Sequence, residues 1–269
     1  MFPVSESGHS SLFHDFSDRY SGACSAITGV IHIAIAIGIV IALHKVFLSL
    51  SKEFVNTFPD IFKKKFSLKN ASPARSFMLM TLISFVPMLL WLIPAGDYGT
   101  FYNLLRSTGF NGTVLDDGLF FIITGLLMLA AAKQLSIARN NKNVSIVCAL
   151  VVGFVCVLLV PVAGLSPVAG IFAVTMLMGV SKKLAFRYCF VMSVPILIVT
   201  GIVEICISVT PAGIVSIILA VIIAAAVTVL AVKILLWMIE TVKIKYFAIY
   251  DFAIGIIACI IGIFEIALK

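Results

Sequence analysis

Two short polar stretches carry the residues that could do chemistry in this otherwise apolar chain. The first is Phe2–Ser11, FPVSESGHSS, which brings together the side chains of Ser5, Glu6, Ser7 and His9. Hydroxyl groups can donate hydrogen bonds to an anion, a carboxylate can bind a metal ion, and an imidazole can transfer a proton. These residues are therefore the first candidates for a functional site.

The second stretch, Pro161–Arg187, lies between long apolar segments and is interrupted near its start by Gly164, Ser166, Pro167 and Gly170. A bilayer does not tolerate irregular backbone that faces lipid, because unpaired N–H and C=O groups are costly there. Irregular backbone at membrane depth must therefore pack inside protein or line a wet cavity. We expect the two stretches to face each other and to share one pocket.

The composition indicates an integral membrane protein. The 269 residues are 62% hydrophobic and only 12% charged, and the mean hydropathy is +1.19. Soluble domains are about 45–50% apolar and about 25% charged. The net charge of +7 comes from basic residues that gather between apolar segments. We interpret it as a topology signal and expect no nucleic-acid partner.

The apolar segments predict about six to seven spanning helices. The predicted spans are Ile27–Leu43, Phe77–Gly96, Leu119–Ala132, Val144–Pro161, Tyr188–Val209, Ile214–Ile239 and Phe247–Leu268. Between the fourth and fifth, Ala163–Val180 is predicted to be a re-entrant loop followed by a half helix. Pro87 and Pro195 are predicted to kink the spans that contain them.

All but three of the 19 lysine and arginine residues fall on one side of this arrangement. The largest group lies in a polar loop between Lys45 and Arg75, which the positive-inside rule places in the cytoplasm. The loop Asp97–Gly118 holds acidic residues and a single arginine, so it is placed outside. The topology also puts both termini and the turn Gly164–Pro167 on the outer side.

The two polar stretches resemble each other, which indicates an internal duplication. Each contains Pro-Val followed by serine and glycine, and each precedes an Arg-Tyr pair, Arg19-Tyr20 or Arg187-Tyr188. An inverted repeat whose two copies supply one midplane site would leave this pattern. We therefore expect a single all-α membrane domain over residues 1–269. Repeat 1 is predicted at about 1–143 and repeat 2 at about 144–269.

Several of these segments resemble the undecaprenyl-diphosphate phosphatase family, the bacitracin-resistance proteins of bacterial membranes. FPVSESGH at Phe2–His9 resembles the family's first motif, E-x-x-x-E-[FW]-L-P-[VI]-S-S-[ST]-G-H, and Ala163–Ile171 aligns with the second, P-G-x-S-R-S-G-x-T. TMLMGVSK at Thr175–Lys182, FVMSVP at Phe190–Pro195 and FAIYDF at Phe247–Phe252 are also similar to the family. The resemblance covers nearly the whole chain.

The resemblance implies six spanning helices and two re-entrant loops in inverted repeats. It implies hydrolysis of the polyprenyl diphosphate that carries cell-wall precursors, assisted by a divalent cation, Mg²⁺ or Ca²⁺. It places the protein in the bacterial plasma membrane with its pocket facing outward. The expected partners are this lipid, as diphosphate or monophosphate, and the membrane, with a homodimer left open.

The resemblance also assigns roles to individual residues. Catalytic roles fall to Ser7, His9 and Ser166, and substrate binding to Ser5, Gly8, His32 and Gly164. Glu6 stands where the family has a serine, and we expect it to replace a missing metal ligand. Each role has a structural alternative. Ser7 and Ser166 could simply cap helix ends. His9 and Glu6 could be solvated, and His32 could be satisfied by packing inside the helix bundle.

The chain departs from the family pattern at charged positions. The paired glutamates of the first motif are absent, because the chain begins at Met1, where the motif has its aromatic residue. Pro167 and Asp251 each stand where the family has arginine, and we expect Asp251 to pair with Lys245 or Arg187. Two explanations stay open. Either the start is assigned too late, or the chain is a diverged paralogue that binds or transports a lipid phosphate without hydrolysing it.

Overall fold

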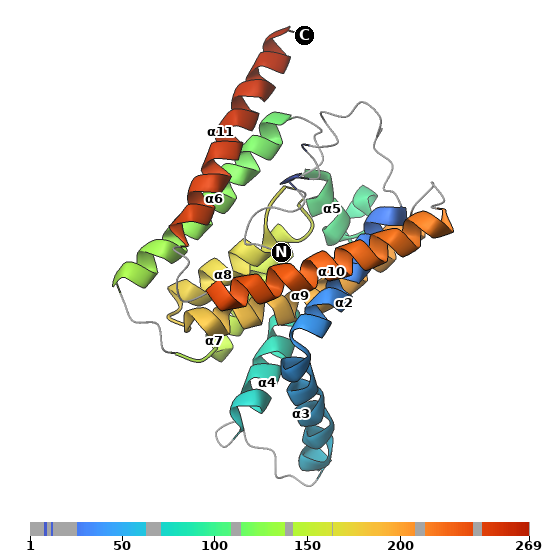
Figure 1. Ribbon diagram of the computed structural model, residues 1–269, viewed down its shortest axis with the longest axis vertical. Helices are drawn as coiled ribbons and strands as arrows, with labels where there is room; N and C mark the ends of the chain where they lie inside the picture. Colours follow the sequence, from blue (N-terminus) through green and yellow to red (C-terminus); the bar gives the residue numbers. More distant parts are fainter. Residues whose placement is uncertain are drawn as a thin grey trace.

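The computed structural model is an all-α assembly (Figure 1). It describes residues 8–9, 12, 26–62, 71–108, 114–137, 142–162, 164–207, 213–238 and 244–268. The α-helices are α2 (Ala26–Ala42), α3 (His44–Phe62), α4 (Pro73–Phe85), α5 (Phe101–Thr108), α6 (Val114–Ile137), α7 (Ile146–Leu159), α8 (Pro167–Leu177), α9 (Lys182–Ile207), α10 (Ile214–Met238) and α11 (Lys245–Leu268), and the 3₁₀ helices are η1 (Pro87–Leu92) and η2 (Gly96–Tyr98). Within these residues, β pairing is limited to two isolated bridges. The predicted all-α fold class is confirmed.

Five helical segments of the described chain are long and apolar enough to cross a membrane: α4 with η1, α6, α9, α10 and α11. The number becomes six if α2 and α3 are taken as one bent span. A helix rises about 1.5 Å per residue and the hydrocarbon core is about 30 Å thick, so these lengths suffice. The prediction of a multi-pass membrane protein is confirmed, and the described residues hold five or six candidate spans where about six to seven were predicted.

The predicted span over Val144–Pro161 is wrong. The helix found there, α7, has 14 residues, which corresponds to about 21 Å. After a turn, α8 adds only 11 residues. Ser145 and Ser166 cap the N-termini of the two helices. Two short helices joined by a turn have the form of a re-entrant hairpin, which begins earlier in the chain than the predicted Ala163–Val180.

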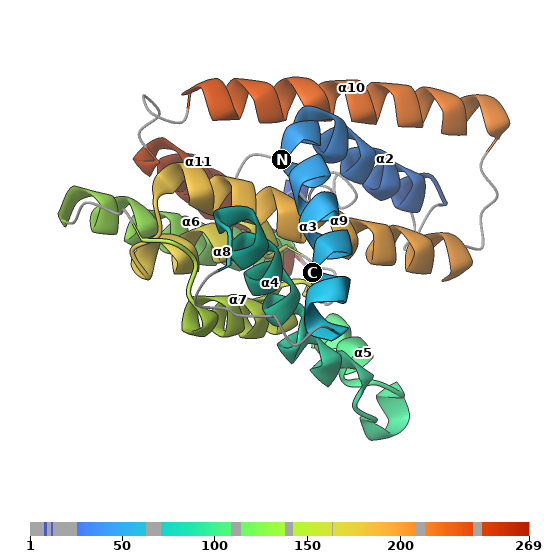
Figure 2. The same cartoon turned by 90° about the horizontal axis from the view of Figure 1, so that it is seen from below.

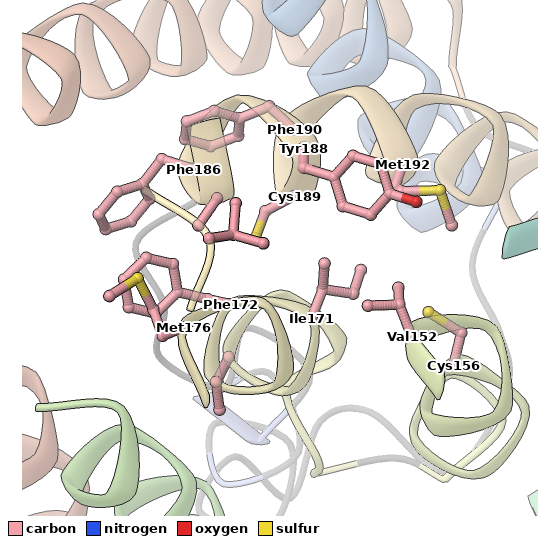
Figure 3. Close-up of a cluster of buried hydrophobic side chains, with 14 of the residues drawn as sticks. Val152, Cys156, Ile171, Phe172, Met176, Phe186, Tyr188, Cys189, Phe190 and Met192 are labelled. Atoms are coloured by element: carbon pink, nitrogen blue, oxygen red, sulfur yellow. The ribbon is translucent and has the colours of Figure 1, made fainter. Parts of the chain in front are cut away.

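This hairpin is covered by α9, as irregular backbone inside a bilayer requires. Figure 3 shows Phe172 and Met176 of α8 near Phe186 of α9, and Ile171 of α8 on the side of Val152 of α7. The rings of Phe172 and Phe186 have centroids 4.2 Å apart. All five side chains are fully buried. Fully buried side chains of α7, α8 and α9 therefore hold the broken segment in place.

The prediction of a polar loop between Lys45 and Arg75 is wrong for residues 44–62. Helix α3 occupies them and makes an angle of 88° with α2. Arg75, in the first turn of α4, donates to the carboxylates of Glu53 (3.0 Å) and Asp60 (2.6 Å) on α3. Charges that were expected to be solvated in a loop are instead paired between two helices, which lie side by side in Figure 1.

The two prolines that were predicted to kink spans behave differently. Helix α4 ends at Phe85 and the 3₁₀ helix η1 begins at Pro87, so the predicted break in this span is present. Pro195 lies inside α9, which continues from Lys182 to Ile207. The α9 segment before this proline is among the most buried parts of the chain, so packing from neighbouring helices supports the backbone there.

Several helix contacts join the halves of the sequence. Helix α2 packs against α9 and α10, and α6 packs along α11 (Figures 1 and 2). A Cβ built on Gly29 would lie 2.5 Å from the Gly201 carbonyl oxygen, and one on Gly201 would lie 2.6 Å from that of Gly29. Gly118 and Gly255 approach each other reciprocally at 2.8 Å. An inverted repeat would produce such reciprocal contacts, and the repeat boundaries remain a prediction.

We predict that Tyr188→Phe destabilises the fold by about 1–3 kcal/mol. The Tyr188 hydroxyl is buried, donates to the Met80 carbonyl at 2.9 Å and lies 2.5 Å from the Ser84 hydroxyl. Ser84 in turn donates to the Ala149 carbonyl at 2.7 Å. Thermal unfolding in detergent micelles measures the effect, and the exposed Tyr246→Phe is the control. Equal melting temperatures for the two variants would contradict the prediction.

Candidate functional site

His9 is held between α6 and α11. Its Nε2 atom lies 2.7 Å from the Tyr250 hydroxyl of α11, and the two rings stack with centroids 5.7 Å apart. The Phe121 ring of α6 meets the imidazole at right angles, with centroids 4.9 Å apart. His9 is therefore partly buried and oriented by two aromatic rings rather than free in solvent. A fixed imidazole is what proton transfer to or from a bound substrate requires.

The second polar stretch reaches the same helix. Gly164 is buried and has a φ of +93°, a conformation that favours glycine. A Cβ at this position would lie only 2.6 Å from Cδ2 of Phe120. Because Phe120 and Phe121 are neighbours on α6, His9 and Gly164 contact successive residues of one helix. This is consistent with a shared pocket, and the pocket itself remains a prediction.

Ser166 lies in the re-entrant turn and is 3% exposed. Its Oγ accepts a hydrogen bond from the Ala169 N–H at 3.2 Å, and Pro167 follows as the first residue of α8. The capping interpretation is therefore observed. The cap fixes the Ser166 oxygen at the N-terminus of α8, and a catalytic role for it remains a prediction.

Two buried polar residues that the prediction did not include flank Phe121 on α6. Asp117 is 4% exposed and Thr124 is 0% exposed. They lie about one turn before and after Phe121, so the three side chains share one face of the helix. Asp117 was assigned to an outer loop, but α6 begins at Val114 and includes it. The spacing 117, 121, 124 is the sequence signal that could have identified this face.

Asp251 of α11 is fully buried without an ion pair. Neither of its carboxylate oxygens has a hydrogen-bond partner. It packs on Gly125 of α6, where a Cβ would lie 3.4 Å from the Asp251 Cβ. The expected pairing with Lys245 or Arg187 is wrong, because the salt bridges among described residues do not include Asp251. Lys245 is exposed and six residues away, which places it on another face of α11.

His32 is bound within the helix bundle. Its Nδ1 lies 2.6 Å from Oε2 of Glu204, which joins α2 to α9. The two side chains are only 23% and 19% exposed. The pair lies at the close contact between Gly29 and Gly201, because a Cβ built on Gly201 would lie 3.3 Å from the His32 Cβ. The structural alternative for His32 is therefore observed, and substrate contact remains a prediction.

We predict that a double-mutant cycle of His32→Gln and Glu204→Gln gives a coupling energy of about 0.5–3 kcal/mol. Each single variant leaves the other half-buried group without its partner. The two single losses of stability should therefore add up to more than the loss in the double variant. Thermal unfolding in micelles provides the free energies. Any hydrolytic activity of folded His32→Gln should stay within a few-fold of wild type. Complete loss of activity with unchanged stability would instead favour substrate binding.

The remaining predicted site residues are only partly described. Ser5, Glu6 and Ser7 lie outside the described residues, whereas Gly8 is described and buried beside His9. Among the described residues, no three His, Cys, Asp or Glu side chains gather as a metal site. Mg²⁺ often binds through one or two carboxylates plus substrate phosphates. The divalent cation, with Glu6 as its expected ligand, therefore remains a prediction.

Comparison with known proteins gives one consistent result. A family profile described as "Bacitracin resistance protein BacA" matches residues 1–257. A protein from Methanosphaera stadtmanae named undecaprenyl-diphosphatase is 27% identical over 275 residues, which cover 97% of this chain and 92% of the relative. A protein of the same name from Alkaliphilus metalliredigens is 23% identical over 266 residues, covering 97% and 93%. One from Christiangramia forsetii is 25% identical over 263 residues, covering 96% and 91%.

Proposed function

We propose, because the chain belongs to the bacitracin resistance protein BacA family, that it hydrolyses undecaprenyl diphosphate in the membrane and so recycles this lipid carrier. The structural observation that carries the proposal is the placement of His9. Its imidazole is fixed between Tyr250 and Phe121, on the helix that also contacts the Gly164 turn. A lipid-linked diphosphate could place its headgroup at these polar groups while its prenyl tail stays among the helices or in lipid.

In the proposed reaction, a water oxygen bonds to the terminal phosphorus, and the bond from that phosphorus to the bridging oxygen breaks. The products are the lipid monophosphate and inorganic phosphate, and a proton of the attacking water must pass to a base. His9 is proposed to accept it. If its Nε2–H donates to the Tyr250 oxygen, the Nδ1 atom carries the lone pair that takes the proton, so Tyr250 sets the tautomer.

The other residues of the site are proposed to bind the diphosphate. Hydroxyls of Ser5 and Ser7, and backbone N–H groups near Gly8 and Gly164, would donate to its oxygens as charge shifts toward the leaving group. A divalent cation, Mg²⁺ or Ca²⁺, would neutralise part of the phosphate charge when bound. Glu6 is the proposed ligand from the first polar stretch.

The pocket is proposed to open on the outer face of the bacterial plasma membrane. Support comes from the distribution of lysine and arginine, which gather near the two ends of the α7–α8 hairpin, away from its Gly164 turn. An outward pocket would meet the lipid diphosphate on the face where cell-wall precursors are consumed. The possibility of a homodimer is kept as part of the proposal.

A phosphate-release assay on the purified protein with a polyprenyl diphosphate, with Mg²⁺ or Ca²⁺ added, tests the activity. We expect release of inorganic phosphate that stops when the cation is chelated, because the charge of the diphosphate is then unscreened. Polyprenyl monophosphate is the substrate control and should yield none. Absence of phosphate release from a folded preparation would contradict the hydrolase proposal.

A second candidate function is binding or transport of a lipid phosphate without hydrolysis. The observation that favours it is Pro167 at the first position of α8. Proline lacks both a positive charge and an N–H donor, at a helix N-terminus where either would contact phosphate. Binding of a polyprenyl phosphate without phosphate release, with no activity gained by Pro167→Arg, would support this candidate over hydrolysis.

A further inference from the structure

Helices α6 and α11 bury polar atoms that have no hydrogen-bond partner among the described residues. Asp251 is 0% exposed, and neither of its carboxylate oxygens has a hydrogen-bond partner. Thr124 is 0% exposed, and its Oγ1 has none either. The two residues lie at the same level, because Asp251 packs on Gly125, the neighbour of Thr124. Three buried oxygen atoms therefore lie at about the same level along the α6–α11 pair.

An ionised carboxylate in an apolar interior costs more than a typical fold can supply, unless a positive charge accompanies it. The two helices cannot easily separate to admit bulk water. A Cβ on Gly118 would already lie 2.6 Å from the Cys259 backbone nitrogen and 2.8 Å from the Gly255 oxygen. The species that neutralises Asp251 must therefore be small enough to enter a close helix contact.

We propose that Asp251 and Thr124 form a buried binding site for a single positive charge, a proton or an alkali cation, between α6 and α11. One carboxylate balances one positive charge, and a buried neutral pair avoids the cost of an isolated ion. The Thr124 hydroxyl can accept a hydrogen bond from a protonated carboxyl group or offer a lone pair to an alkali ion. A divalent ion would leave a net buried charge, because one carboxylate balances only one of its two charges.

The position of this site links it to His9. Asp251 follows Tyr250, whose hydroxyl contacts His9, and Thr124 lies one turn after Phe121, which contacts the same ring. Occupancy of the site would thus be transmitted to both contacts of the histidine. The proposal goes beyond the proposed hydrolysis and does not depend on it, because it concerns the packing of two helices.

Thermal unfolding of wild type and Asp251→Asn in detergent micelles tests the proposal. Melting temperatures are recorded from mildly acidic to mildly alkaline pH in sodium, potassium or N-methylglucamine chloride at equal ionic strength. With only the bulky organic cation, wild type should lose about 2–4 °C or more as the pH rises, because the folded state must give up its bound proton. Asp251→Asn needs no neutralising charge, so its melting temperature should change less with pH.

Other titratable groups must be excluded as the source of this dependence. They are Asp116, Asp117 and Lys133 on α6, Lys245, Tyr246, Tyr250, Cys259 and Glu265 on α11, and His9 against both helices. All of them remain in Asp251→Asn, so only the difference between the two curves is interpreted. Asp116→Asn, at a half-buried position of the same helix contact, is the matched control and should keep the wild-type dependence.

The outcomes separate the two forms of the proposal. If sodium or potassium restores the melting temperature at high pH, the ligand is an alkali cation; if neither salt matters, it is a proton. Thr124→Val should weaken the pH dependence of the melting temperature in either case. If Asp251→Asn yields no folded protein, the comparison of wild type with Thr124→Val tests the proposal instead. A flat wild-type curve, or an Asp251→Asn curve with the full wild-type dependence, overturns the proposal whatever the hydrolytic activity.

Discussion

Replacing His9 by alanine is expected to slow phosphate release from a polyprenyl diphosphate by about 10²- to 10⁴-fold, the usual range for loss of a general acid or base. The imidazole is the one described proton-transfer group that is fixed on both sides by aromatic rings and lies on the helix that also contacts the Gly164 turn. Steady-state assays with saturating lipid give the change in kcat.

The matched control is His44→Ala, since His44 is an exposed histidine at the bend between α2 and α3. Its activity should stay within a few-fold of wild type. Tyr250→Phe keeps the stacked ring but removes the hydroxyl 2.7 Å from Nε2. Loss of a group that only orients another typically lowers activity by about 10–100-fold. The kcat of Tyr250→Phe should therefore fall between those of His44→Ala and His9→Ala. If His9→Ala retains full activity, proton transfer by His9 is excluded.

The spanning helices could be predicted because their signal is local. A run of about 20 apolar residues is visible without knowledge of its neighbours, and α10 and α11 agree closely with the predicted segments Ile214–Ile239 and Phe247–Leu268. The secondary-structure predictions fail where contacts with distant parts of the chain determine the structure. Helix α3 was assigned to a loop because its charges suggest solvation. The structure pairs Glu53 with Arg75, a residue 22 positions later in the chain.

The candidate site could be predicted only in part, for the same reason. His9 and Gly164 were predicted from local composition, because polar residues and glycine interrupt an otherwise apolar chain. Tyr250 could not be, because a tyrosine in an apolar helix is unremarkable until its contacts are known. The hydrogen bond from His9 to Tyr250 spans 241 positions. No periodicity in either segment reports such a contact.

Burial also separates residues that the sequence treats alike. Asp116 and Asp117 are adjacent acids in the first turn of α6, where a negative charge is favourable at the helix N-terminus. Only Asp117 is buried, since it shares a helix face with Phe121 whereas Asp116 does not. Composition and charge counts assign both aspartates to an outer loop. Only their positions around the axis of α6 distinguish the buried residue from the half-buried one.

Gly255→Val is expected to destabilise the protein by about 1–3 kcal/mol or more. A Cβ on Gly255 would lie 2.8 Å from the Gly118 carbonyl oxygen and 3.0 Å from the Ile122 backbone nitrogen. Backbone atoms of a facing helix cannot rotate away as a side chain can, so α6 and α11 must move apart. Thermal unfolding in micelles should show a lower melting temperature.

The same displacement should reach the site, because α11 carries Tyr250 and α6 carries Phe121, the two residues that fix His9. Gly255→Val should therefore lose phosphate release even under conditions where it stays folded. The control, Ala226→Val, adds a side chain of the same kind to an exposed position on the spanning helix α10 and should change neither property. A Gly255→Val protein with wild-type stability and activity would show that the close approach of α6 and α11 is not needed to hold the histidine.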